Sequence, residues 1–127
     1  MTPPGRILLA EDDRILRKAA EVTLRRKGYQ VMVAIDGQDA LAKIREHTPD
    51  LILLDVMMPK LDGFEVLERV KADPDTRGIP VIMLSNLDEA SNARRAADCG
   101  AEAYLVKSNL RPEQLAQIVA ETLARAG

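Results

Sequence analysis

Short apolar runs alternate along the chain with longer segments in which apolar residues recur every third or fourth position. Apolar runs bounded by turn residues are typical of buried strands in a parallel sheet, whereas the longer spacing is typical of helices that bury one face. The predicted strands are residues 6–10, 30–35, 51–55, 81–85 and 103–107. Strict alternation of strands and helices predicts an α/β fold, a doubly wound five-stranded parallel sheet covered on both faces by five helices.

Terminal signals set the limits of these helices. Gly28 and Gly100 are favourable stops for the first and fourth helices, Asp36 is a favourable N-cap for the second, and the fifth begins near Pro112. The third helix is predicted from about Phe64 to Ala72. Apolar residues at helical spacing support these assignments, with the alanines of the fourth helix facing inward: Ile15, Leu16, Ala19, Val22, Ala40, Leu41, Ile44, Phe64, Leu67, Val70, Ala90, Ala93, Ala97, Leu115, Ile118, Val119 and Leu123.

Polar residues follow four of the predicted strands. If these strands are close together in a parallel sheet, their carboxyl ends bring Glu11, Asp12, Asp55, Ser85 and Lys107 to one edge, where ligands bind in α/β sheets. Clustered carboxylates repel one another unless a cation is present, and an all-oxygen cluster suits Mg²⁺. Asp55 would then be a nucleophile toward a phosphoryl group, whose remaining oxygens Lys107 and Ser85 would contact. The pattern predicts covalent phosphorylation of Asp55.

The segments 7–13 (ILLAEDD) and 55–63 (DVMMPKLDG), together with Ser85 and the stretch from Tyr104 to Lys107, resemble the receiver domains of bacterial two-component response regulators. The resemblance extends from Arg6 to Ala124. It implies a flavodoxin-like sheet in the order 2-1-3-4-5, with residues 1–127 forming a single receiver domain. It also implies transfer of a phosphoryl group to Asp55 from a histidine kinase or a histidine phosphotransfer protein.

The same resemblance implies a role for each residue of the acidic site. Asp12 would be a direct Mg²⁺ ligand beside Asp55 and the backbone carbonyl of Met57. Glu11 would complete the acidic pair and act through water, and Asp13 would be a neighbour rather than a ligand. The chain would then not be an enzyme but a phosphoacceptor that assists its own phosphorylation and slow dephosphorylation.

The implied switch consists of Ser85, whose hydroxyl moves toward the phosphoryl group, and Tyr104, whose ring turns inward behind it. The downstream protein target would bind the face made by the fourth helix, fifth strand and fifth helix. Met57 and Leu87 occupy positions that the family uses to orient or block hydrolytic water, and neither side chain hydrogen-bonds well. We therefore expect slow self-dephosphorylation.

Another departure from the family lies beside the lysine. Many receivers place a proline after this lysine, joined by a cis peptide bond, whereas Ser108 follows Lys107. The loop into the last helix is therefore expected to take a different path. The first helix is basic, which fits either a position near the kinase-docking face of the family or a solvated polar surface. His47 is expected to be a capping or surface group.

Composition excludes several other classes. A formal charge of −2 gives no basic surface for nucleic acid, and no apolar run is long enough to cross a bilayer, so we expect a cytoplasmic protein without membrane insertion. Cys99 is the single cysteine, so an internal disulfide and a cysteine zinc cluster are both excluded. We expect its side chain to be a small buried apolar group.

Two alternatives to the phosphoacceptor remain. A flavin-binding protein of flavodoxin-like fold would need a phosphate-cradling loop after the first strand, where the chain instead has Glu11, Asp12 and Asp13. A receiver-like interaction scaffold that is never phosphorylated would be expected to have lost part of the site, yet Asp55 and Lys107 are both present.

Overall fold

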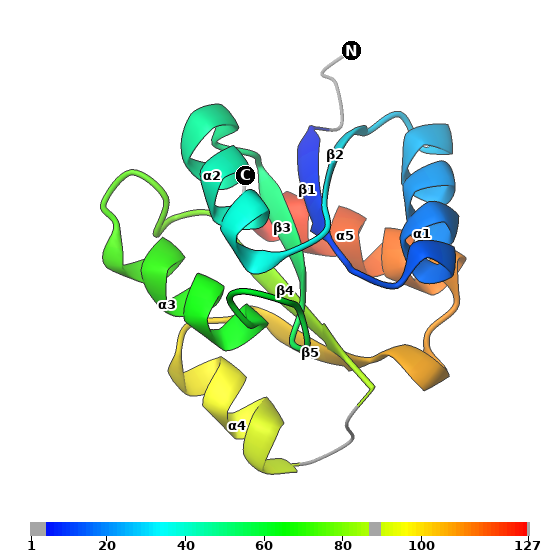
Figure 1. Ribbon diagram of the computed structural model, residues 1–127. Coiled ribbons are helices and arrows are strands. Elements are labelled where there is room, and N and C mark those ends of the chain that lie inside the picture. Colours follow the sequence, from blue (N-terminus) through cyan, green and yellow to red (C-terminus); the bar gives the residue numbers. More distant parts are fainter. Residues whose placement is uncertain (1–4, 87–89, 127) are drawn as a thin grey trace.

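The computed structural model describes residues 5–86 and 90–126 (Figure 1). The strands form one parallel sheet in the order β2-β1-β3-β4-β5, which confirms the predicted topology. The strands are β1 (Arg6–Ala10), β2 (Gln30–Ala34), β3 (Leu51–Asp55), β4 (Val81–Ser85) and β5 (Ala103–Val106). The helices are α1 (Arg14–Arg26), α2 (Gly37–His47), α3 (Gly63–Ala72), α4 (Ala90–Asp98) and α5 (Pro112–Ala126), with a short 3-10 turn, η1 (Lys107–Asn109).

The helices cover both faces of the sheet (Figure 1). Helices α2, α3 and α4 pack on one face and α1 and α5 on the other, so that each face has its own apolar cluster. Strand β3 lies at the centre and alternates between them: Leu51 and Leu53 belong to the α1/α5 cluster, Ile52 and Leu54 to the opposite one, and all four are fully buried. Burial on both faces fixes the register of β3 and therefore the position of the Asp55 side chain that follows.

Two helices bury a different row of residues from the one that the sequence spacing suggests. In α1 the buried residues are Ala20 and Leu24, whereas Ile15 is 80% exposed. In α4 the buried alanine is Ala96, 1% exposed, and the prediction that Ala97 faces inward is wrong because Ala97 is exposed. Successive helix positions differ by about 100° around the axis, so a shift of one residue turns a different face to the sheet.

The ends of the elements largely follow the terminal signals. Asp36 caps α2 as predicted, accepting a hydrogen bond from the Asp39 N–H at 2.8 Å. Helix α3 begins one residue earlier than predicted, because Asp62 and Glu65 form a reciprocal capping box. Strand β5 ends before Lys107, which opens η1, and within residues 5–86 and 90–126 every peptide bond is trans.

Strand β2 is at an edge of the sheet, yet two of its outward-facing carbonyls are occupied. The backbone groups of Gln30 and Ala34 hydrogen-bond toward β1, so the carbonyls of the alternate residues Val31 and Val33 point away from it. Arg25 from α1 donates to the Val31 oxygen at 3.0 Å, and Lys43 from α2 donates to the Val33 oxygen at 2.7 Å. Cations at an edge discourage pairing with a strand of another chain.

In the part of the chain that the structure describes, no helix combines the length and the apolar character that crossing a membrane requires.

Candidate functional site

The predicted site residues meet at one edge of the sheet. Strands β1, β3, β4 and β5 are parallel, and their carboxyl ends are followed or closed by Glu11, Asp12, Asp55, Ser85 and Lys107. Strands β1 and β3 are neighbours, although the helices that follow them lie on opposite faces. Such a reversal is the topological switch point of a doubly wound sheet, and ligands bind outside the strand ends at this point.

Asp55 is the last residue of β3 and is 2% exposed. Its Oδ1 atom accepts a hydrogen bond from the Met57 N–H at 3.2 Å, and its Oδ2 atom is 2.9 Å from Lys107 Nζ. The loop after Asp55 returns close to the strand: the Gly63 N–H donates to the Val56 carbonyl at 2.8 Å. A Cβ atom on Gly63 would be 2.3 Å from the Asp55 carbonyl oxygen, so this close approach requires glycine.

Glu11 shares the same lysine. Its Oε1 atom is 2.6 Å from Lys107 Nζ, and its Oε2 atom accepts a hydrogen bond from the Asp13 N–H at 3.1 Å. The side chains of Glu11 and Lys107 are only 3% and 8% exposed. Since a buried charge needs a partner, the lysine and the two buried carboxylates form one interdependent group.

Electrostatics make this group short of positive charge. The pKa of Asp55 is raised to about 8, mainly by burial and also by its hydrogen bond with Glu11, although the Lys107 ammonium opposes both effects. Burial alone would lower the pKa of Lys107, but its contacts with Glu11 and Asp55 hold it above its ordinary value. The lysine therefore stays charged, while one proton competes with any other cation for Asp55.

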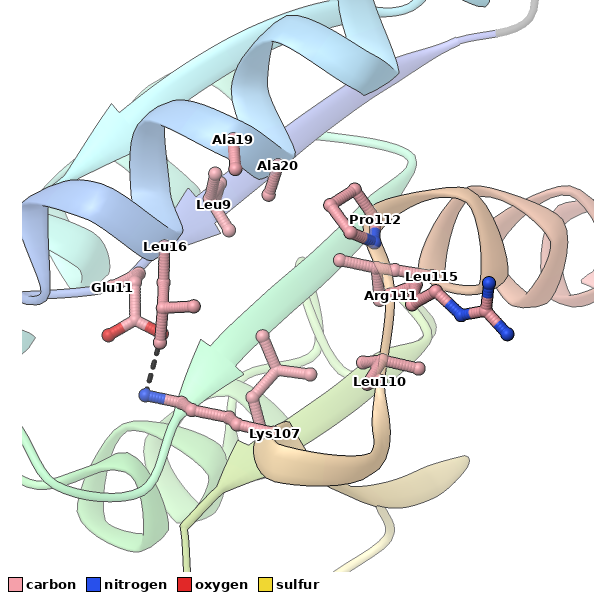
Figure 2. A pocket seen from close by; sticks show the side chains of 11 residues that line it. Leu9, Glu11, Leu16, Ala19, Ala20, Lys107, Leu110, Arg111, Pro112 and Leu115 are labelled. Atoms are coloured by element: carbon pink, nitrogen blue, oxygen red, sulfur yellow. Dashed lines mark ion pairs between the residues drawn. The ribbon is translucent and has the colours of Figure 1, made fainter.

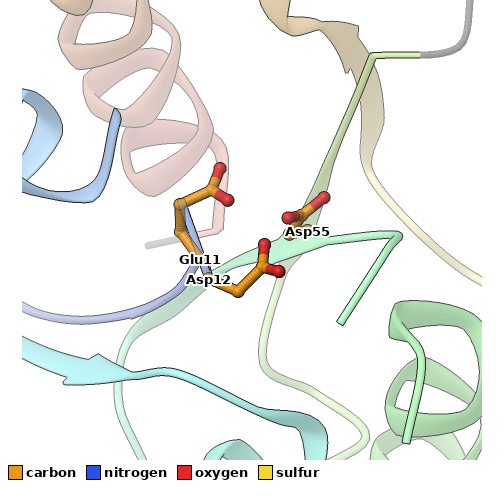
Figure 3. Close-up of side chains that lie close together, drawn as sticks. All are labelled: Glu11, Asp12 and Asp55. Atoms are coloured by element: carbon orange, nitrogen blue, oxygen red, sulfur yellow. The ribbon is translucent and has the colours of Figure 1, made fainter. Parts of the chain in front are cut away.

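The donor set fits a hard divalent cation. Glu11, Asp12 and Asp55 each offer a carboxylate oxygen, and these oxygens lie within 4.8 Å of one another (Figure 3). Asp12 is exposed, whereas the other two are buried, so the cluster is open to solvent on the Asp12 side. Mg²⁺ and Mn²⁺ take oxygen ligands and commonly keep several waters, which matches a few carboxylates beside solvent.

Lys107 reaches the carboxylates past an apolar wall. A cavity of about 60 Å³ lies between α1 and the segment from η1 to α5, lined in part by Leu9, Leu84 and Leu110 (Figure 2). The lysine ammonium points from this wall to Glu11, as the dashed line in Figure 2 shows. The lysine side chain is only 8% exposed, so little solvent screens its charge, and this strengthens the ion pair.

The remaining predicted residues differ in their burial and in their position in the fold. Ser85 ends β4 fully buried, and Tyr104 lies on β5, partly buried against the apolar cluster under α2, α3 and α4. Met57 is 63% exposed beside Asp55, while Leu87 lies outside the described residues. His47 ends α2, away from the strand ends that form the site.

Two contacts at the site were missed by the sequence interpretation. Asp13 is the N-cap of α1, accepting hydrogen bonds from the Ile15 and Leu16 N–H groups at 2.9 and 3.1 Å, although an acid before a helix is a known cap signal. The Arg17 guanidinium donates to the carbonyls of Glu11 and Asp12. For Arg17 the sequence offered only its membership of a basic helix.

The chain is similar in sequence to response regulators. A family model described as the response regulator receiver domain matches residues 7–120. Protein PilG from Pseudomonas aeruginosa is 36% identical over 115 residues, which cover 91% of this chain and 85% of PilG. The gliding motility regulatory protein of Myxococcus xanthus is 46% identical over 114 residues, which cover 90% of this chain but 15% of that protein.

The fold is similar as well. A putative response regulator from Chloroflexus aurantiacus superposes with a TM-score of 0.89 at 34% identity, covering 96% of this chain and 99% of the other. Several further relatives are longer: the chain spans 44% to 49% of the length of regulators from Streptomyces, Synechocystis and Mycolicibacterium.

Proposed function

Because the chain belongs to the response regulator receiver domain family and is thus a phosphoacceptor switch, we propose that Asp55 is its phosphorylation site. We also propose that residues 1–127 make up one receiver domain that works in the cytoplasm. The observation that most supports Asp55 as the phosphorylation site is the position of the Lys107 ammonium, 2.9 Å from Asp55 and 2.6 Å from Glu11. It is a fixed cation beside the oxygen that would receive a phosphoryl group.

The reaction is a displacement at phosphorus. An Asp55 carboxylate oxygen forms the new P–O bond while the P–N bond to a donor phosphohistidine breaks, and the bonding electron pair stays on the imidazole nitrogen. Lys107 balances negative charge on the phosphoryl oxygens, and the Ser85 hydroxyl contacts one of them. In this way the chain assists its own phosphorylation, although the energy of the transferred group comes from the donor.

Mg²⁺ is the cofactor we propose. Asp12, Asp55 and the backbone carbonyl of Met57 would hold it directly, and Glu11 would act through water. When bound it supplies the positive charge that the acidic cluster lacks and neutralises phosphoryl oxygens. This assignment is supported by three carboxylate oxygens within 4.8 Å of one another, one of which belongs to the exposed Asp12 and is open to solvent.

The output follows from a switch involving Ser85 and Tyr104. Phosphorylation adds charge at the carboxyl end of β3, beside the β4 end that carries Ser85, and Tyr104 lies on the next strand. We propose that Ser85 moves toward the phosphoryl group and the Tyr104 ring turns inward, which changes the surface of α4, β5 and α5. A downstream protein would bind this face, and the chain would not bind nucleic acid directly.

The donor would be a histidine kinase or a histidine phosphotransfer protein. We also propose slow loss of the phosphoryl group, because the exposed Met57 side chain has no group that could orient a hydrolytic water. A half-life of seconds for the phosphorylated protein with Mg²⁺ present would contradict this expectation.

The flavin alternative is disfavoured by the site. Glu11 and Asp12 follow β1, where a flavin phosphate would have to bind, and both carboxylates would repel it. The scaffold alternative predicts a chain that carries the same fold without accepting a phosphoryl group, which is a difference that can be measured.

The test is intact mass spectrometry after incubation with acetyl phosphate. We expect one phosphoryl adduct on the unmodified protein with Mg²⁺, much less when Mg²⁺ is chelated, and none on Asp55→Asn. The Asp50→Asn variant, changed at an exposed aspartate remote from the cluster, is the matched control and should behave as the unmodified protein. No adduct on the unmodified protein would favour the scaffold.

A further inference from the structure

We propose that Arg17 is a positioning residue for the metal site, because its guanidinium holds the backbone of the acidic pair in place. This inference rests on the proposed function. Arg17 is half-buried on the first turns of α1, and its Nη1 atom donates to the Glu11 carbonyl at 2.9 Å and to the Asp12 carbonyl at 3.4 Å. A single guanidinium nitrogen thus contacts the backbone of both consecutive acids.

The contact matters most for Asp12. The Glu11 side chain is held by Lys107 and by the Asp13 N–H, at 2.6 and 3.1 Å. Within residues 5–86 and 90–126, by contrast, the Asp12 carboxylate forms no hydrogen bond or ion pair. The direction of this carboxylate therefore depends on its backbone, and Arg17 is the side chain that fixes that backbone.

The rest of the turn is held at its other end. Asp13 caps α1 through the Ile15 and Leu16 N–H groups, and the Arg17 N–H donates to the Asp13 carbonyl at 2.9 Å. Residues 11–13 thus connect β1 to α1 with Asp12 between a buried acid and a helix cap. Removing a group that contacts a metal ligand and orients it typically lowers metal affinity by about 10- to 100-fold.

A role of Arg17 through its charge and a role through backbone positioning predict opposite effects of its removal on Mg²⁺ affinity. If Arg17 acted only through its positive charge, removing it would reduce repulsion of a cation and tighten Mg²⁺ binding. If it acts by fixing the backbone, removing it weakens Mg²⁺ binding. The Arg17→Lys variant keeps the charge, but its compact ammonium on a flexible stem cannot reproduce the rigid guanidinium geometry.

The control is another arginine of the same helix. Arg25 also donates to a backbone carbonyl, that of Val31 at 3.0 Å, and pairs with Glu21 at 2.9 Å, but it lies at the far end of α1. Arg25→Met therefore removes a comparable contact without touching the acidic pair.

The experiment is calorimetric titration of Mg²⁺ into the unphosphorylated protein, with thermal unfolding in chelator as a check on folding. We expect about tenfold weaker binding for Arg17→Met, weaker binding for Arg17→Lys, and no change for Arg25→Met. Phosphorylation by acetyl phosphate should need more Mg²⁺ in both Arg17 variants but reach the same rate at saturation. If Arg17→Met does not fold, Arg17→Lys alone decides.

Unchanged or tighter Mg²⁺ binding by the folded Arg17 variants would overturn this inference, as would a matching loss in Arg25→Met. The proposed function fails differently: the unmodified protein would then bind no Mg²⁺ or accept no phosphoryl group. Normal binding and phosphorylation of the unmodified protein, combined with unaffected Arg17 variants, would reject the positioning role alone.

Discussion

Replacing Lys107 by methionine probes the buried ion pair without opening a large space, because the two side chains are of similar length. The ammonium balances two carboxylates, Glu11 and Asp55, and all three side chains are at most 8% exposed. The substitution leaves both acids buried without a cation. Breaking a buried pair by removing one partner typically costs about 3–5 kcal/mol.

The lower end of this range applies here, because Asp55 already has a pKa near 8 and can take up a proton. We therefore expect Lys107→Met to lower the free energy of unfolding by about 3 kcal/mol at pH 8 in chelator. With about 2.1 cal/mol/K of unfolding entropy per residue, a chain of 127 residues loses about 11 °C in Tm. Mg²⁺ should restore part of this loss by supplying the missing positive charge.

The loss should depend on pH in a defined direction. The folded-state pKa of Asp55 is raised, so this group stabilises the fold fully below its ordinary pKa of 3.8, and its contribution is lost as pH rises toward about 8. Lys107 lowers that pKa, so its removal shifts the loss to higher pH and makes it larger. The difference between the two proteins should therefore be smaller at pH 5 than at pH 9.

The assay is urea denaturation followed by circular dichroism at pH 5, 7 and 9, in chelator and with Mg²⁺. Lys27→Met is the matched control, since Lys27 pairs with Glu113 at 3.1 Å while both side chains are more than half exposed. Such exposed pairs contribute about 0–1 kcal/mol. Equal stability of Lys107→Met and the unmodified protein at pH 9 in chelator would refute the buried-pair reasoning.

A single and a double variant test the backbone of the site and the edge of the sheet. Gly63→Ala should lower the free energy of unfolding by about 2 kcal/mol and weaken Mg²⁺ binding, because the added Cβ would press on the Asp55 carbonyl. Gly78→Ala, whose Cβ would meet nothing within 4 Å, should be nearly neutral. Urea denaturation and calorimetry measure both effects. Replacing Arg25 and Lys43 together by methionine should expose the β2 edge and cause concentration-dependent association in light scattering; a monomeric double variant would contradict this.

The strands were predictable because one rule links sequence to position, whereas their order was implied by the resemblance to receiver domains. Apolar runs such as Leu51 to Leu54 must be buried on both faces, and the alternation with helices leaves few topologies. The same rule brings Asp55 and Lys107 to one edge, and the structure adds the ion pair between them. The chemistry of the site could therefore be inferred from residues more than fifty positions apart.

Helix faces were less predictable, for a physical reason. In α1 the apolar residues Ile15 and Leu16 are adjacent, so spacing alone supports two overlapping stripes, and only packing on the sheet selects the one with Ala20 and Leu24. In α4 small alanines carry little burial energy, which leaves the helix rotation to its neighbours. Arg95 over the Phe64 ring, 4.1 Å from its centroid, is one such contact that no pattern reveals.

The contact of Arg17 with the acidic pair was beyond prediction for a related reason. A hydrogen bond from a helix side chain to the carbonyls of the preceding loop depends on the path of that loop, and the path depends on the Asp13 cap and on the pairing of Glu11 with Lys107. Each of these contacts is local, but their combination becomes visible only in three dimensions.

Borohydride reduction of the protein phosphorylated with acetyl phosphate and Mg²⁺, followed by peptide sequencing in a mass spectrometer, would locate the modified residue. Reduction of an aspartyl phosphate leaves homoserine in place of the aspartate. Asp55 should be converted, while Asp12 and Asp13 should remain unchanged. Homoserine at another aspartate, or no converted residue at all, would contradict the assignment of Asp55 as the phosphorylation site.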